Sequence, residues 1–229
     1  MDVVEKDAAS TRAQRGHPAA AAGLVFCALY LASYLAVRGL PDPAWSNQQI
    51  SSYYTTDQAD RLRIVALYAV PFAGIAFLWF LAAFRDQVAR LAGNVNTTLA
   101  TVQMLSGAAY VTLQFCPAAA LASAHMALAD APRTADVTGA RPVLFLGNTI
   151  LIVFALRAAG VFMAAGTTRA LRAGMFPKWF AVVSYVLAIV LMFTADSVRG
   201  VVLIFPLWIG VVSAVILIHR PRMLAERTA

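Results

Sequence analysis

The polar residues that could carry chemistry in this chain are few, and most recur along one apolar stretch. Between residues 98 and 125, seven residues follow one another at steps of three or four: Gln103, Gly107, Tyr110, Gln114, Pro117, Leu121 and His125. That spacing places them on one face of an α-helix. Because an amide is costly to expose to hydrocarbon, this face is predicted to point into a helix bundle. Two interpretations remain open: hydrogen bonds between helices around a Pro117 kink, or a polar cavity for a small molecule or ion.

The next apolar run contains two further candidates, Asn148 and Arg157. They are nine residues apart, so they lie on opposite faces of a helix and cannot form one site. Arg157 is predicted about 9 Å inside the cytoplasmic face of the hydrocarbon core. Its guanidinium either snorkels to the surface or is a buried cation. The expected partners of a buried cation are backbone carbonyls near Pro71, Pro117 or Pro206, the glutamine amides, buried water, or an anionic lipid or ligand. Close approach of a neighbouring helix is favoured by the small residues around it, Ala155, Ala159, Gly160 and Ala164.

Motifs for catalysis and cofactor binding are absent from the sequence. The three histidines, at positions 17, 125 and 219, are too dispersed for a haem or di-iron site, and Cys27 and Cys116 form no CxxC pair. There is no HExxH, no GxSxG and no phosphate-binding glycine loop. We therefore expect no catalytic residue, no metal site and no cofactor.

The elements that must position these residues are apolar helices. Of 229 residues, 61% are hydrophobic and only 13% are charged, and the mean hydropathy is +0.72. Soluble domains carry about 25% charged residues, so the apolar excess here must face lipid. Soluble enzymes, secreted disulfide scaffolds and disordered chains are excluded. The net charge of +7 does not indicate nucleic acid binding, because the bases lie in short segments between apolar runs.

Six apolar runs are long enough to cross a bilayer: 19–37, 62–84, 98–125, 143–166, 179–195 and 201–218. They predict an all-α polytopic bundle of six transmembrane helices in a single domain, residues 19–219. A disordered tail, 1–18, precedes it and a basic tail, 220–229, follows it. With the N-terminus inside, eleven of the 18 Lys and Arg residues, Arg169 among them, fall in cytoplasmic segments and six fall outside. The positive-inside rule therefore predicts that both termini are cytoplasmic.

A short helix is predicted between the first two transmembrane helices. Ser46 followed by Gln49 matches a capping box, and Ile50, Tyr53 and Tyr54 share one apolar face. Such a helix would lie along the outer interface, either as an amphipathic connector or as a lid over a binding cavity. The second outer loop, 126–142, is predicted to be flexible.

Three segments carry a family resemblance: ISSYY at 50–54, FLWFLAAFR at 77–85 and ALRAGMFPKW at 170–179. In these segments the chain resembles a group of uncharacterised six-helix membrane proteins common in actinobacteria. The resemblance implies an all-helical integral membrane protein and transfers no catalytic, binding or cofactor residue. Alanine richness and the presence of only two lysines are typical of a GC-rich bacterial genome. The expected location is therefore the bacterial cytoplasmic membrane.

Three functions remain open. The most favoured is a non-enzymatic structural or accessory membrane component, which would contact other membrane proteins and, through its basic inner surface, anionic lipid. The alternative is a small transporter or a lipid- or solute-binding bundle that uses the stripe from Gln103 to His125 together with Arg157. An enzyme acting on a lipid is the least favoured.

Overall fold

The computed structural model describes residues 17–36, 45–54, 57–92, 97–128, 139–193 and 200–218, and over these ranges the chain is helical without a strand. Residues 1–16 of the first predicted tail and all of the second, 220–229, lie outside the described residues, as does the centre of the predicted flexible loop, 129–138. His17 and Pro18, predicted as part of the first tail, instead begin the first helix. Proline is favoured in a first helical turn because its missing N–H has no partner there.

Each predicted apolar run is a helix. The first is α2 (His17–Ala36), and the third is α6 (Thr97–Leu128). The second comprises α4 (Asp57–Ile64), the π-helical η1 (Val65–Ala69) and α5 (Val70–Ala92). The fourth comprises α7 (Ala140–Thr149), the π-helical η2 (Ile150–Ala155) and α8 (Leu156–Arg172). The last two are α9 (Lys178–Phe193) and α10 (Ile204–Ile218), the latter preceded by a 3₁₀ turn, η3 (Val201–Leu203).

Three of the described helices are long and apolar enough to cross a membrane: Asp60–Leu91, Thr97–Ala127 and Arg141–Arg172. Three others are apolar but shorter: Ala20–Ala36, Lys178–Phe193 and Val201–Leu217. The second and fourth runs extend several residues beyond their predicted ends. Helical backbone hydrogen bonds continue into polar sequence, so an apolar run marks only the hydrophobic part of each helix.

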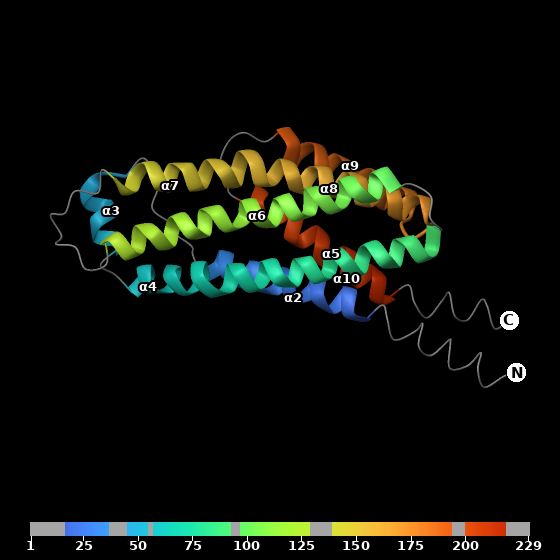
Figure 1. The fold of residues 1–229 in the computed structure, drawn as a ribbon, viewed down its shortest axis with the longest axis horizontal. Helices are drawn as coiled ribbons and strands as arrows, with labels where there is room; N and C mark the ends of the chain where they lie inside the picture. Colours follow the sequence, from blue (N-terminus) through green and yellow to red (C-terminus); the bar gives the residue numbers. More distant parts are fainter. Residues whose placement is uncertain are drawn as a thin grey trace, which may run out of the picture.

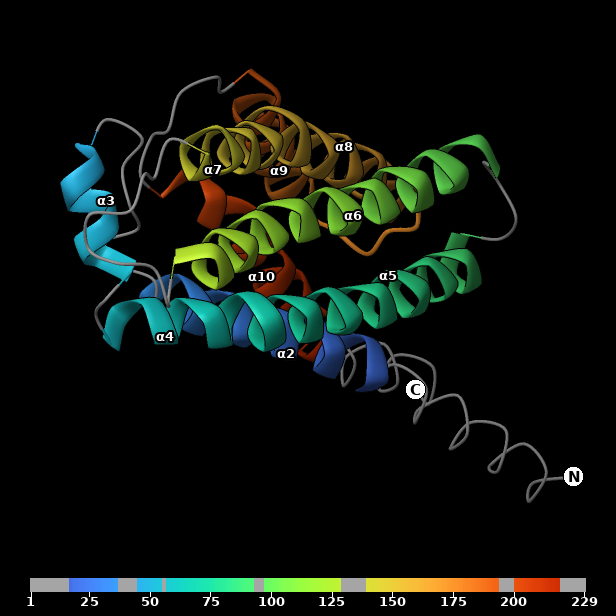
Figure 2. The same cartoon turned by 60° about the vertical axis from the view of Figure 1, so that its left-hand side comes forward.

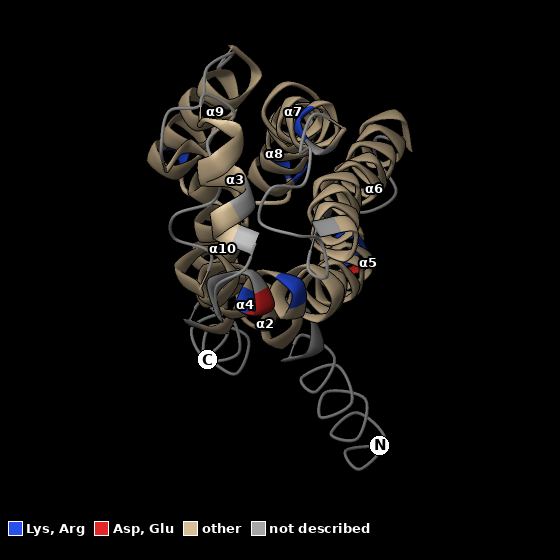
Figure 3. Ribbon diagram, turned by 90° about the vertical axis from the view of Figure 1, so that its left-hand side faces the viewer, with Lys and Arg blue, Asp and Glu red and all other residues tan. Residues whose placement is uncertain are grey.

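The helices pack in a ring, which Figure 3 shows end-on. α2 packs against α5 and α10, α6 packs against both α5 and α8, and α9 packs against α8. The long helices run the whole length of the molecule, whereas α2, α9 and α10 occupy one part of it (Figures 1 and 2). We call the end at which α5 and α8 terminate and α6 and α9 begin the basic end. The short helix α3 (Asn47–Tyr54) covers the opposite end, which we call the α3 end.

The centre of the ring is filled by aromatic side chains from five helices: Phe26, Phe77, Tyr110, Phe162 and Phe205. All five are at most 2% exposed. The ring of Phe77 lies 5.2 to 5.5 Å from each of the other four, mostly edge to face. Edge-to-face pairs add about 0.5–1.5 kcal/mol each beyond the area that they bury. We call this group the aromatic plug.

The π-helical turn η1 has a local cause. It ends directly before Val70–Pro71, and Pro71 has no N–H to donate to the preceding turn. In η1 the Val70 N–H instead bonds the Val65 carbonyl, five residues back. This widened turn lets the helix continue through the proline instead of ending there.

A Schellman motif ends α8. The Met175 N–H bonds the Ala170 carbonyl at 2.9 Å, and the Gly174 N–H bonds the Leu171 carbonyl at 3.1 Å. Gly174 has φ +69°, a conformation that favours glycine. Pro177 then prevents the helix from continuing, and α9 begins at Lys178. The last turn of α8 is thereby held in a fixed geometry at the basic end.

Candidate functional site

The polar stripe predicted on the third run faces the interior of the bundle. Gln103 is fully buried, and Tyr110 and His125 are 2% and 4% exposed. Gly107 and Pro117 are also buried, while Gln114 and Leu121 are half-buried. α6 is continuous through Pro117. The stripe does not form one site, because its polar members lie at three separate levels along α6 and each has different neighbours.

At the basic end, Gln103 accepts a hydrogen bond from the Arg169 guanidinium, Nη1 to Oε1. Arg169 lies in the last turn of α8 and is 7% exposed. Gly166, one turn before it, leaves room for the Gln103 amide: a Cβ there would lie 3.0 Å from Gln103 Nε2. Arg85 on α5 is near enough to repel Arg169 electrostatically. Gln103, Arg169 and Arg85 therefore bring one neutral amide and two cations close together.

The sequence prediction did not anticipate that Arg169 lies inside the bundle. It was counted as a charge in a cytoplasmic segment after a run ending at Gly166, whereas α8 continues to Arg172. Ala155, Ala159, Phe162, Gly166 and Arg169 recur at steps of four and three, and all are buried. Arg169 thus continues the inward face of α8, and that spacing was the signal that could have identified it.

At the middle level, the Gln114 side chain donates from Nε2 to the Tyr30 hydroxyl on α2 at 3.4 Å. The Tyr30 hydroxyl also interacts with Tyr110, a member of the aromatic plug. Two further polar pairs join other helices: Trp208 Nε1 donates to Ser184 Oγ at 2.9 Å, and the hydroxyls of Thr168 and Tyr185 are 2.8 Å apart. These side chains form hydrogen bonds across helix interfaces, although Gln114 Oε1 has no partner among the described residues.

At the α3 end, His125 Nε2 lies 3.7 Å from the Asp60 carboxylate on α4. The predicted capping box is confirmed: Gln49 N–H donates to Ser46 Oγ at 3.2 Å and Ser46 N–H donates to Gln49 Oε1 at 2.8 Å. Ile50 and Tyr53 of α3 pack with a small cluster contributed by three other helices: Leu62, Ala124 and Leu144.

Side-chain contacts from α7 also hold α3 in place. Arg141 donates to the Trp45 carbonyl and to Asn47 Oδ1. The ring of Trp45 in turn packs edge to face against Tyr53, with centroids 6.1 Å apart. Burial raises the pKa of the Tyr53 phenol above its ordinary value. α3 is therefore docked on the ends of the long helices.

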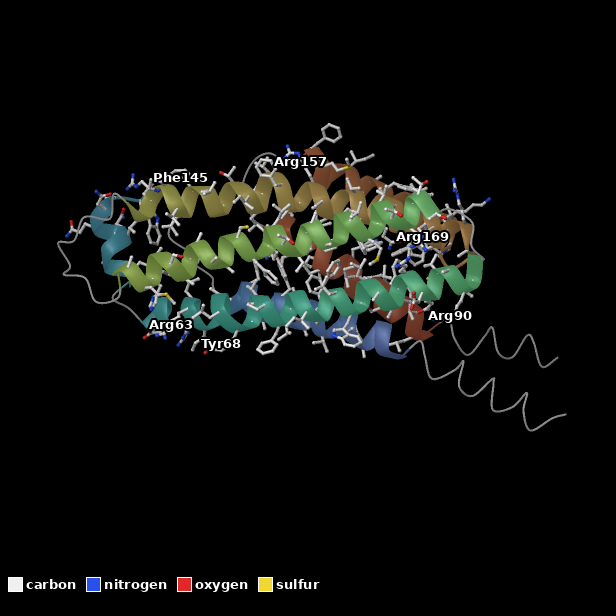
Figure 4. All side chains as sticks on the ribbon, viewed as in Figure 1. Arg63, Tyr68, Arg90, Phe145, Arg157 and Arg169 are labelled. Carbon is white, nitrogen blue, oxygen red and sulfur yellow. The ribbon has the colours of Figure 1, made fainter. Side chains whose placement is uncertain are left out.

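Arg157 lies on the outside of the bundle, well away from Arg169 on the same chain segment (Figure 4). It is half-buried, and its guanidinium donates to the Val153 carbonyl one turn back in the same helix. The predicted partners on other helices are therefore not the ones it uses. Asn148 on α7 is exposed, so its side chain does not face the interior of the bundle. The predicted close helix approach is present, because Gly160 contacts Ala188 and Met192 of α9.

The two ends of the bundle differ in charge. Among the described residues, the basic end carries five bases and one acid: Arg85, Arg90, Arg169, Arg172, Lys178 and Asp86. The α3 end carries three bases and two acids: Arg61, Arg63, Arg141, Asp57 and Asp60. Arg90 and Arg63 mark the two ends in Figure 4. In the described part of the chain, no group of three His, Cys, Asp or Glu side chains could hold a metal ion.

Comparison with known proteins adds no further assignment: no family model, curated protein or solved structure matches the chain.

Proposed function

We propose that the chain is a multi-pass integral membrane protein with six transmembrane helices and both termini in the cytoplasm of a bacterial cell. Large apolar side chains on the perimeter of the bundle support this proposal. Trp79 on α5 is 69% exposed, and Trp179 and Phe193 on α9 are 69% and 79% exposed. Water would be a poor solvent for such a surface, whereas lipid chains would cover it. The excess of bases at the basic end supports its cytoplasmic orientation.

The orientation can be tested with single cysteines in a Cys27→Ala, Cys116→Ala background. Gly139→Cys lies at the α3 end and Arg172→Cys at the basic end, and both positions are exposed. An impermeant thiol reagent added to intact spheroplasts should label Gly139→Cys alone. Labelling of Arg172→Cys alone would reverse the orientation, and labelling of both would contradict the sidedness of the bundle.

Within the membrane we propose a non-enzymatic structural or accessory role. The observation that carries it is the aromatic plug, which fills the ring of helices where a transport path would need room. The hydrogen bonds of Gln114 with Tyr30 and of Trp208 with Ser184 support the same role, because they join side chains across helix interfaces. A lipid- or solute-binding role is the second candidate, and the cationic surroundings of Gln103 at the basic end favour it.

The accessory role predicts that water does not reach the stripe on α6. Ser106→Cys and Ala118→Cys place thiols at two buried positions of that helix, both below 10% exposed. In membranes opened to both sides, neither should react with a small impermeant thiol reagent, while Arg172→Cys reacts fully as a positive control. Reaction of either buried cysteine would indicate a water-filled cavity and favour transport.

A further inference from the structure

The Arg169 guanidinium is buried at the basic end without a counter-ion in the described part of the chain. Its hydrogen bond goes to the neutral Gln103 carbonyl oxygen. The ion pair between His125 and Asp60 lies at the other end of the bundle, and no described carboxylate is within ion-pair distance of Arg169. Burying a charge without an opposite charge is expensive, and the repulsion from Arg85 adds to the cost. An anion at this position would remove both penalties.

The Gln103 amide supplies a second, independent observation. Because Arg169 can only donate, it fixes the amide with Oε1 toward the guanidinium and Nε2 away from it. Gln103 is fully buried, and its Nε2 has no hydrogen-bond partner among the described residues. That nitrogen lies against Gly166, one turn from Arg169. The unused groups of this pair are therefore donors, the amide nitrogen and the remaining guanidinium N–H groups, and the exposed Arg85 adds a second cation nearby. A matching ligand must accept hydrogen bonds and carry negative charge.

The position of Arg169 along its helix indicates where such a ligand would lie. The apolar helix Arg141–Arg172 has 32 residues. At 1.5 Å per residue it is about 48 Å long, so about 9 Å extends beyond each side of a centred hydrocarbon core of about 30 Å. Arg169 is three residues from the end of α8, which places it about 4.5 Å from the end of the helix and at the depth of lipid headgroups. Phosphate is the anionic group found at that depth.

We propose that Arg169, Gln103 and Arg85 form a binding site for a phosphate group, with Arg169 as its principal ligand. This inference relies on the proposed membrane location but not on the proposed accessory role. A guanidinium presents parallel N–H groups that match two phosphate oxygens, which a lysine does not. The phosphate belongs either to the headgroup of an anionic lipid or to a soluble phosphate ion.

Thermal unfolding of the full-length protein in a neutral maltoside detergent distinguishes the two sources. Three probes are compared at constant ionic strength: dioctanoyl phosphatidylglycerol, dioctanoyl phosphatidylcholine and sodium phosphate. A lipid site predicts that phosphatidylglycerol raises the unfolding midpoint by about 5 °C or more at 100 times its dissociation constant, while the other two have little effect. A midpoint raised by sodium phosphate as strongly as by the lipid assigns the site to soluble phosphate. No response to either anion overturns the proposal.

Arg169→Gln should weaken binding of the active anion at least tenfold, because a charge-assisted hydrogen bond is lost. The matched control is Arg172→Gln, which removes an exposed base three residues along the same chain segment and should change the dissociation constant less than twofold. Arg157→Gln is a second control, because that guanidinium lies on the outside of the bundle. Equal losses in Arg169→Gln and Arg172→Gln would reveal attraction by general surface charge and would overturn the site.

Gln103→Glu keeps the test decisive if Arg169→Gln does not fold. The substitution is nearly isosteric and places a carboxylate against the guanidinium, so the protein would carry its own counter-ion. We expect the unfolding midpoint without added anion to rise and the response to anion to be lost. A response that matches that of the unaltered protein would show that Arg169 does not bind the anion. Cysteine labelling of the two ends of the bundle tests membrane orientation separately, so the two proposals can fail independently.

Discussion

Gly160→Ala should force α8 and α9 apart. A Cβ at Gly160 would lie 2.6 Å from Met192 Cγ and 2.8 Å from the Ala188 carbonyl oxygen. Both distances are well below ordinary van der Waals contact. The Met192 side chain can rotate away, but the carbonyl oxygen moves only if the backbone of α9 moves with it. The added methyl group therefore cannot be accommodated by side-chain rearrangement alone.

Two effects of opposite sign decide the magnitude. Replacing glycine with alanine inside a helix normally stabilises it by about 0.5–1 kcal/mol. Adding a methyl group to a packed interface costs about 1–3 kcal/mol, and contact with a backbone atom puts this site toward the upper end. The net loss is about 1–2 kcal/mol, which for a chain of this length lowers the unfolding midpoint by about 2–8 °C.

Thermal unfolding in detergent measures this difference, with Gly139→Ala as the matched control. A Cβ at Gly139 has no atom within 4 Å, and its φ of −72° suits any residue. Gly139→Ala should therefore leave the midpoint unchanged or raise it slightly. Adding Met192→Ala to Gly160→Ala should not restore stability, because the carbonyl contact persists. A midpoint raised by Gly160→Ala alone would refute the close approach of the two helices.

Three other predictions concern single polar groups. Ser184→Ala should cost about 1–3 kcal/mol, because the buried Trp208 Nε1 loses its acceptor, and chemical denaturation of the purified protein will measure the loss. Gln114→Leu should cost only about 0.6 kcal/mol, since its bond to Tyr30 is long; a loss above 2 kcal/mol would indicate a larger polar network. Because burial raises the pKa of Tyr53, docking of α3 is at full strength below pH 10.0 and weakens as the pH rises above that value. Limited proteolysis should detect the release of α3 at high pH, and Tyr53→Phe should abolish the pH dependence of that cleavage.

The sequence predicted the features that depend on local periodicity. The apolar runs located every long helix, the steps of three and four residues identified the buried face of α6, and Ser46 with Gln49 located the start of α3. Each of these signals lies within one helix or one turn. The helix ends were less predictable, because the sequence becomes polar several residues before the helix ends.

Partners on other helices could not be predicted. The bond between Gln103 and Arg169 joins residues 66 positions apart, and that between Gln114 and Tyr30 joins residues 84 apart. Residue spacing within one helix does not indicate either partner, because both bonds depend on which helices lie side by side in the ring. Arg157 shows the opposite case, because its carbonyl partner lies only four residues away and was overlooked in favour of distant ones.

In the proposed membrane location, the unequal lengths of the described helices would have a consequence for the surrounding bilayer. α5, α6 and α8 adjoin on one side of the ring and belong to segments of more than 30 residues, whereas α9 on the other side has 16, or about 24 Å. A hydrocarbon core of about 30 Å fits neither side. Lipids would have to compress beside α9, while the long helices would tilt or extend into the aqueous phase. The protein would thus impose a step in thickness on the membrane around it, with shorter acyl chains preferred beside α9.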